Sequence, residues 1–192
     1  MCYTKTASGR CMRASAGCRN LFYQNHCRIP CGIHSVFSNT FIFDAENDGK
    51  EGYLYSLVTT SIIQGIKSIP VYVEADVSDG MPLFEMVGSL SPEVKESKER
   101  VRTALKNTGY ILPPKRITIN FIPANIRKTG SGFDLPVVAA VLCAIGIVPE
   151  EALKDTMVVG EISLSGDVKP VNGILPMVAE AKERGVTRCI VT

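Results

Sequence analysis

The sequence predicts an α+β domain in which helices pack on a mixed β-sheet. Three observations support this fold class: β-branched runs with a two-residue period, other runs with a helical period, and a mixed order of the predicted strands and helices. The chain has 192 residues, 45% of them apolar and 21% charged, which is typical of a globular protein. Its formal net charge of +2 argues neither for nor against a nucleic-acid or other acidic partner.

The regular region begins with two predicted strands. The runs YSLVTTSII and IPVYVEADVS are rich in β-branched residues and are separated at Gly65. Asp79 and Gly80 form a strong turn signal, which predicts a hairpin between the second run and the following LFEMVG.

The segment SPEVKESKERVRTALKNTG is expected to form an amphipathic surface helix. Ser91 is a favourable N-cap, Pro92 suits the first helical position, and Gly109 ends the helix. Glu96 and Arg100 are spaced to pair on the polar face. The predicted apolar face consists of Val94, Val101 and Leu105.

The remaining runs predict a strand, two helices, a hairpin and a last strand. RITINFIP alternates as a strand, and DLPVVAAVLCAIG is apolar on all sides, as expected of a central buried helix. TMVVGEISLSGDVKPV is expected to form a hairpin whose turn contains Gly166, GILPMVAEAKERG a helix that Gly185 ends, and RCIVT a strand. The predicted inward-facing residues are Ile117, Ile119, Phe121, Ile174, Met177, Val178 and Ala181.

Residues 1–53 differ in composition from residues 54–192, and we expect a domain boundary between them. Five of the seven cysteines and both histidines lie in the front segment, which has no acidic residue before Asp44. We expect this segment to be an atypical extension, either disordered or translated from upstream of a non-AUG start at Leu54. Lys50-Glu51-Gly52 can be encoded by a purine-rich ribosome-binding sequence, which supports the second interpretation.

The front segment also contains one candidate metal site. Cys18, Cys27, Cys31 and His34 could form a zinc knuckle, because thiolate and imidazole are the usual ligands of structural zinc. No second paired knuckle follows in the sequence, so the preferred interpretation has no metal site.

No segment predicts a membrane span or a secretory signal. The longest apolar run, from 135 to 148, contains Pro136 and Gly146 and is too short to cross a bilayer. The first residues are basic but have no continuous apolar stretch. Cys143 and Cys189 lie in apolar contexts, which favours reduced core thiols. We therefore expect a cytoplasmic protein with no membrane partner.

The stretch RKTGSGFDLP is the strongest candidate for chemistry. It lacks the G-x-x-x-x-G-K-[ST] pattern of a phosphate loop and the G-x-G-x-x-G pattern of a dinucleotide site. Nucleophilic catalysis by Ser131 would need a base, and the regular region contains no histidine. A Ser–Lys dyad with Lys128, Lys169 or Lys182 is the catalytic alternative. The preferred interpretation is a tight glycine turn into a helix capped by Ser131 or Asp134.

A group of basic residues near the strand RITINFIP is a candidate contact for phosphate or DNA. It comprises Lys106, Lys115, Arg116, Arg127 and Lys128. The preferred interpretation is a solvated face whose charges Glu96 and Glu99 balance.

Three runs together resemble one known family. VVGEISLSGDVKPVNGILPMVAEAKERGV is similar to a run that recurs in Lon-protease-like domains. With MPLFEMVGSLSPEVKESKERVRTALKNTGY and RITINFIPANIRKTGSGFDLPVVAAVL, it resembles the N-terminal ChlI-type domain of the Mg-chelatase-like AAA+ ATPases, the YifB and ComM family. The resemblance covers residues 54–192 and implies the fold of ribosomal protein S5 domain 2. Family members typically begin Met-Tyr-Ser, which favours a native start at Leu54.

The resemblance also implies a domain without peptidase activity. The serine of the Lon protease falls on Gly132 and its lysine near Leu175, so both catalytic positions lack the required group. In the full-length protein, the resemblance implies a following AAA+ module that binds ATP and Mg²⁺, a homo-oligomeric ring, and an action on DNA in competence. The Walker motif is absent here, so we expect a chain truncated before that module and without a cofactor of its own. A Ser–Lys peptidase and a stand-alone interaction module are the alternatives.

Overall fold

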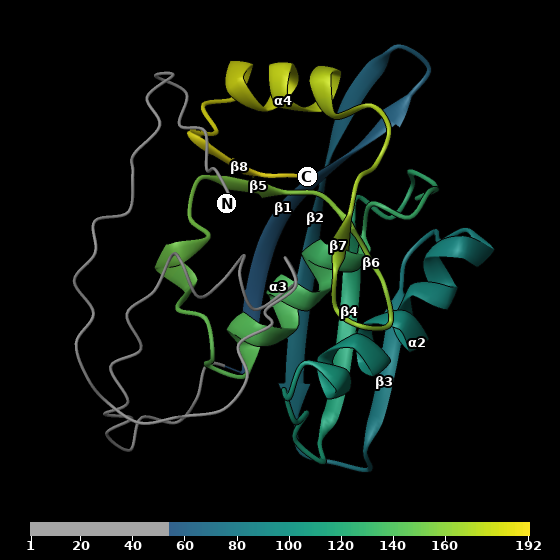
Figure 1. The fold of residues 1–192 in the computed structure, drawn as a ribbon, viewed down its shortest axis with the longest axis vertical. Helices are drawn as coiled ribbons and strands as arrows, with labels where there is room; N and C mark the ends of the chain where they lie inside the picture. The colour runs from purple at the N-terminus through teal and green to yellow at the C-terminus, as the bar shows by residue number, and fades with distance from the viewer. Residues whose placement is uncertain (1–53) are drawn as a thin grey trace.

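A long antiparallel hairpin forms the centre of the fold (Figure 1). The computed structural model describes residues 54–192, and within them β1 (Tyr55–Gln64) pairs along its whole length with β2 (Lys67–Ser78). Gly65, at a φ of 64°, supplies the left-handed backbone that the tight turn between the two strands requires. The two strands predicted on either side of this glycine are confirmed.

Four further strands extend the hairpin into a six-stranded mixed sheet with the order β3-β4-β2-β1-β5-β8. β4 (Arg116–Ile122) is antiparallel to β2, and β3 (Leu83–Val87) is parallel to β4. On the other side, β5 (Thr156–Val158) is parallel to β1, and β8 (Arg188–Ile190) is parallel to β5. The mixed sheet of the predicted α+β class is therefore confirmed.

The predicted hairpin between β2 and β3 is wrong. Asp79 and Gly80 do lie in a bend, but β4 occupies the place between the two strands. Two strands separated by a third lie about 9.6 Å apart, and the four connecting residues can span roughly 13 Å. The connection is thus long enough to pass over the end of β4. The local turn signal predicted the chain reversal but not the strand that lies beside it.

Helix α3 (Asp134–Ala144) is the centre of the hydrophobic core. All of its residues are buried, which confirms the predicted central helix. It packs against β1 and β2, on the face of the sheet to which Val58 and Val73 point. The Ser56 hydroxyl on this face donates to the Ala140 carbonyl at 2.7 Å, so a polar side chain is satisfied within the core. No helix within residues 54–192 is long and apolar enough to cross a membrane.

Helix α2 (Pro92–Asn107) packs on α3 and runs beside β3 at one end of the sheet (Figure 1). Ser91 has the extended backbone of an N-cap, but its side chain makes no cap hydrogen bond. The predicted apolar face is confirmed, since Val94, Val101 and Leu105 are all buried.

Helix α4 (Ile174–Glu183) covers the opposite face of the sheet, over the β1–β2 hairpin and near β5 and β8. Val158 of β5 points into the core around α3, so the residues on either side of it point to the other face. There they form a second apolar cluster, which contains Met157, Val159, Met177 and Ala181. Ile174 and Val178 are partly buried against the same cluster, so the predicted apolar face of α4 is confirmed.

A separate hairpin of β6 (Glu161–Ile162) and β7 (Val168–Lys169) follows β5 and the short helix η1 (Glu150–Ala152). Its turn contains Gly166, as predicted, and contacts the C-terminal end of α2. There the Asn107 side-chain amide donates to the Leu164 carbonyl at 2.7 Å.

Gly166 should be intolerant of a side chain. Its φ is +89°, and a Cβ atom would lie 2.2 Å from Cγ2 of Thr108. We predict that Gly166→Ala lowers the free energy of unfolding by about 2–4 kcal/mol, from the left-handed backbone and the steric overlap together. Urea denaturation of the 192-residue chain measures this change.

Gly146→Ala is the matched control, because Gly146 has a φ of +75° but nothing within 4 Å of its Cβ position. It should lose only the backbone term of about 1–2 kcal/mol. Thr108→Ser removes Cγ2 and should recover part of the loss in the Gly166 variant. Equal losses in the two glycine variants would contradict the proposed overlap.

Candidate functional site

The turn that carries Ser131 connects β4 to α3 and is held against the segment between β5 and β6. The Gly160 N–H donates to the Gly132 carbonyl at 3.1 Å, and the Leu135 N–H donates to the Gly160 carbonyl at 3.0 Å. A Cβ atom on Gly160 would lie 3.0 Å from the side chains of Leu135 and Val168. Glycine at this position therefore allows the two segments to approach closely enough to form both hydrogen bonds.

Ser131 itself is partly exposed in this turn. Its hydroxyl makes no hydrogen bond with any residue in the range 54–192. The N-cap of α3 is Phe133, which has a helical backbone and no side-chain cap hydrogen bond. The prediction that Ser131 or Asp134 caps the helix is therefore wrong, and the Asp134 carboxylate bonds elsewhere.

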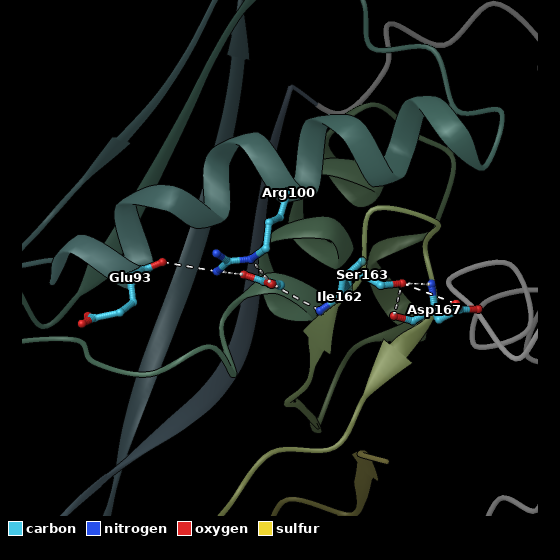
Figure 2. A network of polar contacts seen from close by, with 6 residues as sticks. Glu93, Arg100, Ile162, Ser163 and Asp167 are labelled. Atoms are coloured by element: carbon cyan, nitrogen blue, oxygen red, sulfur yellow. Dashed lines mark hydrogen bonds and ion pairs between the residues drawn. The ribbon is translucent and has the colours of Figure 1, made fainter.

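Asp134 lies at the centre of a polar network that joins three elements. Figure 2 shows two of its partners, Arg100 on α2 and Ile162 on β6. Oδ2 of Asp134 accepts hydrogen bonds from Nε of Arg100 at 2.9 Å and from the Ile162 N–H at 3.2 Å. Its Oδ1 accepts one from the Arg100 guanidinium at 3.1 Å, so the pair is bidentate. The guanidinium also donates to the Glu93 carbonyl at 3.2 Å. The network thereby links α2, α3 and β6.

Burial makes this ion pair structural rather than reactive. The Asp134 side chain is fully buried, whereas 26% of the Arg100 side chain is exposed. The hydrogen bond to Asp134 raises the pKa of the Arg100 guanidinium above its ordinary value. Each charge is compensated by the other, and no oxygen of the carboxylate is available to a substrate.

The predicted pair between Glu96 and Arg100 is wrong, because Arg100 turns toward Asp134 instead. A signal for the true partner was present in the sequence. Asp134 is the one charged residue in the run from 133 to 148. A carboxylate at the start of a helix that is buried on all sides requires a cation or several donors.

Lys128 is buried, and its ammonium group caps the end of β4. The amine donates to the carbonyl of Phe121 at 3.2 Å and to that of Pro123. Burial lowers the pKa of this lysine. Its backbone N–H and carbonyl are also bonded, to Ser89 and Ser91. Lys128 therefore holds the loop after β4 in place and presents no charge at the surface.

The other lysines considered as a base for Ser131 are exposed. The Lys169 side chain is 51% exposed, and its amine lies 3.9 Å from Oδ2 of Asp167. Lys182 is exposed on α4. Neither has the desolvated surroundings that would make a lysine a base at neutral pH.

The two positions that resemble the catalytic pair of Lon differ in their surroundings. A Cβ atom on Gly132 would lie 3.4 Å from Val159 and 3.7 Å from Val171, so a side chain there would start between two valines. Leu175 lies on α4 and is 81% exposed. The structure therefore places neither a hydroxyl nor an amine at these positions.

The basic residues proposed as a DNA contact do not gather into one patch. Lys115 pairs with Asp79 at 3.0 Å, and Arg116 pairs with Glu85 at 2.9 Å. These partners differ from the glutamates at 96 and 99 that the sequence suggested. Lys128 is buried, as described above.

The exposed Lys106 lies in the last turn of α2, whereas Arg127 adjoins the bridge to Leu90 near the start of that helix. The helix has 16 residues, so its ends are about 24 Å apart.

The candidate zinc ligands, Cys18, Cys27, Cys31 and His34, lie outside the described residues. Within residues 54–192, no group of three or more histidine, cysteine, aspartate or glutamate side chains is arranged to hold a metal ion. Cys143 and Cys189 are both free thiols, and burial raises the pKa of Cys143 to about 12.

Removal of the buried carboxylate should strongly destabilise the fold. We predict that Asp134→Ala lowers the free energy of unfolding by about 3–5 kcal/mol, because Arg100 and the Ile162 N–H then lose their partner. The double variant Arg100→Met/Asp134→Leu should lose less, since it leaves no unpaired charge. Urea denaturation of each variant tests both statements.

Glu99→Ala is the control, because Glu99 forms an exposed pair with Arg102 at 3.6 Å. Its effect should not exceed about 1 kcal/mol. An Asp134→Ala variant as stable as this control would show that the network does not hold the three elements together.

Comparisons with known proteins place this site within a described family. The family described as subunit ChlI of Mg-chelatase matches residues 73–192. YifB of Escherichia coli, named an uncharacterized protein, is 38% identical over 130 residues, which are 68% of this chain and 26% of YifB. Competence protein ComM of Haemophilus influenzae is 35% identical over 128 residues, 67% of this chain and 25% of ComM.

A third relative is a protease. Lon protease 2 of Bacillus subtilis is 33% identical over 118 residues, which are 58% of this chain and 21% of the protease. The chain thus spans about a quarter of the length of YifB and ComM. Because the family match extends from the second half of β2 through the Ser131 turn to the last strand, the chain belongs to the family of subunit ChlI of Mg-chelatase, which it shares with YifB and ComM.

Proposed function

We propose that residues 54–192 are a non-catalytic, Lon-like domain of a Mg-chelatase-like AAA+ ATPase. One observation carries the proposal: the turn at Ser131 is hydrogen-bonded to the segment after β5, but within residues 54–192 no base contacts the serine hydroxyl. Lys128 donates to main-chain carbonyls, and Lys169 is exposed beside Asp167. A group that cannot reach the serine proton cannot activate it.

The fold proposed for this domain is that of ribosomal protein S5 domain 2, which Lon-like domains share. The mixed sheet, the buried helix after the Ser131 turn and the similarity to Lon protease 2 support this assignment. A shared fold does not bring the shared chemistry with it, because catalysis depends on particular side chains.

ATP and Mg²⁺ are proposed for the full-length protein rather than for these residues. The 192 residues contain no G-x-x-x-x-G-K-[ST] sequence, so they lack the phosphate-binding loop of a Walker-type ATP site. We assign ATP hydrolysis to an AAA+ module that follows this domain, in a cytoplasmic homo-oligomeric ring. The name of the relative ComM, a competence protein, supports a role on DNA during competence.

The gene sequence beyond codon 192 tests this assignment directly. An in-frame continuation with a Walker motif, in a protein that hydrolyses ATP and loses that activity when the Walker lysine is replaced by alanine, is the expected result. A stop codon directly after Thr192 would contradict the proposal and favour a stand-alone interaction module.

A Ser–Lys peptidase is the second candidate, because the Ser131 hydroxyl is partly exposed and forms no hydrogen bond within residues 54–192. We predict that a fluorophosphonate probe does not label the native 192-residue chain above the level of a urea-unfolded control. The reason is that no lysine within residues 54–192 is hydrogen-bonded to this serine and able to deprotonate it. Intact-protein mass spectrometry measures the labelling. Adduct formation that Ser131→Ala abolishes and Ser165→Ala leaves unchanged would establish the peptidase instead.

Direct DNA binding by this domain should not depend on the pair at the start of β4. We predict that Lys115→Ala/Arg116→Ala leaves the salt dependence of DNA binding unchanged, because both side chains are already engaged by Asp79 and Glu85. Fluorescence anisotropy with a labelled duplex, measured over a range of salt concentrations, gives the slope of log K against log salt. A slope smaller by about 2 in the double variant would show that both groups contact phosphates.

A further inference from the structure

Among residues 54–192, strand β3 forms an edge of the six-stranded sheet. It pairs with β4 on one side only, and α2 runs beside it (Figure 1). An edge strand turns the N–H and C=O groups of alternate residues away from its neighbour, where they are available to another chain. Over its five residues, β3 offers an edge of about 17 Å.

A shallow groove lies along this edge, between β3 and α2. Its volume is about 250 Å³, and it is lined by four consecutive strand residues, from 83 to 86, and by Lys95 and Lys98 of the helix. This volume is below the range of roughly 300–1,000 Å³ that is usual for small-molecule sites. A groove bounded by an edge strand and a helix suits an extended peptide better than a compact ligand.

The charge in the groove is positive. Lys95 and Lys98 form no ion pair with any residue in the described part of the chain. The one acid of the lining, Glu85, is paired with Arg116 at 2.9 Å. The groove thus presents two uncompensated ammonium groups to an incoming chain.

The two sides of β3 differ in character. Phe84 is buried and Met86 partly buried on the side of α2, whereas Leu83 and Val87 are 44% and 39% exposed on the open face of the sheet. Successive side chains of an added strand would also point alternately to these two sides. One set would face the lysines, and the other would lie beside the two exposed aliphatic side chains.

We propose that β3 binds an extended acidic peptide segment of a partner protein by strand addition. The segment alternates acidic and aliphatic residues, so that its carboxylates meet Lys95 and Lys98 while its aliphatic side chains cover Leu83 and Val87. Main-chain hydrogen bonds to β3 supply sequence-independent affinity, and the two lysines select the acidic register.

A second copy of the chain fits the edge less well. Antiparallel pairing of two β3 strands would continue the sheet and place both α2 helices on the same face. The lysines of both copies would then lie near one another with no added acid, and such a like-charge arrangement disfavours association. The charge of the groove therefore favours a partner of opposite sign.

The test uses the 192-residue chain and a fluorescein-labelled peptide of about eight residues that alternates glutamate and valine. Fluorescence anisotropy should show saturable binding, and the same peptide with lysine in place of glutamate should not bind. Lys95→Glu/Lys98→Glu should weaken binding by about tenfold or more. Lys67→Glu/Lys154→Glu is the matched control, because it makes the same change in net charge at two other exposed lysines and should leave binding unchanged.

Backbone pairing is tested with the peptide itself, which avoids variants that fail to fold. Two versions are N-methylated at alternate residues, one on the odd positions and one on the even positions. Strand addition predicts that one version loses binding and the other retains it, because only one set of N–H groups faces β3. The proposal would be overturned if both methylated peptides bound equally well. It would also be overturned if the groove variant and the control variant lost peptide binding equally, or if the chain dimerised through β3 without binding peptide.

Discussion

The fold depends on one buried ion pair, between Arg100 and Asp134. The carboxylate is fully buried and the guanidinium meets it through two hydrogen bonds, while the Ile162 N–H provides a third donor. An unpaired charge at this position would remove a large part of a total stability that is typically about 5–15 kcal/mol. The apolar surface of α3 packs without direction, so it does not by itself fix the rotation or depth of the helix. The ion pair supplies that specificity, because its geometry is satisfied in one arrangement of α2, α3 and β6 only.

The same arrangement supports the proposal that the turn at Ser131 is not catalytic. Two ionisable residues flank this serine at a distance of three positions, and both are used to hold the structure. Asp134 is neutralised by Arg100, and the Lys128 amine is directed to the carbonyls that end β4. Within residues 54–192, the Ser131 hydroxyl makes no hydrogen bond to a group that could take its proton. Under the proposed function, the relation to Lon-like domains is one of architecture rather than chemistry, because a shared fold does not carry the catalytic side chains with it.

The sequence predicted those elements whose signal is local and periodic. The strands on either side of Gly65, the amphipathic α2 and the uniformly apolar α3 were all found from residue spacing, because burial on one face or on all faces leaves that pattern. Features that depend on distant partners were not found. The prediction of a hairpin between β2 and β3 was wrong because β4 lies between these two strands in the sheet. β4 begins more than thirty residues after the end of β2 in the sequence. Lys128 looked like a surface charge because its sequence neighbours are polar, and its burial follows from the path of the loop after β4.

The two ends of the sheet differ in how far other elements cover them, and this asymmetry has a physical consequence. Near β1 and β5 the second face is covered by α4, which buries Met157 and Val159. Near β3 no element within residues 54–192 covers the outer edge, and the exposed aliphatic residues there would invite pairing with any other strand. Lys95 and Lys98 limit this hazard, since desolvating an ammonium group without a partner is unfavourable. The same two charges that discourage self-association therefore leave the edge open to one class of chain, the acidic one, which compensates them as it pairs.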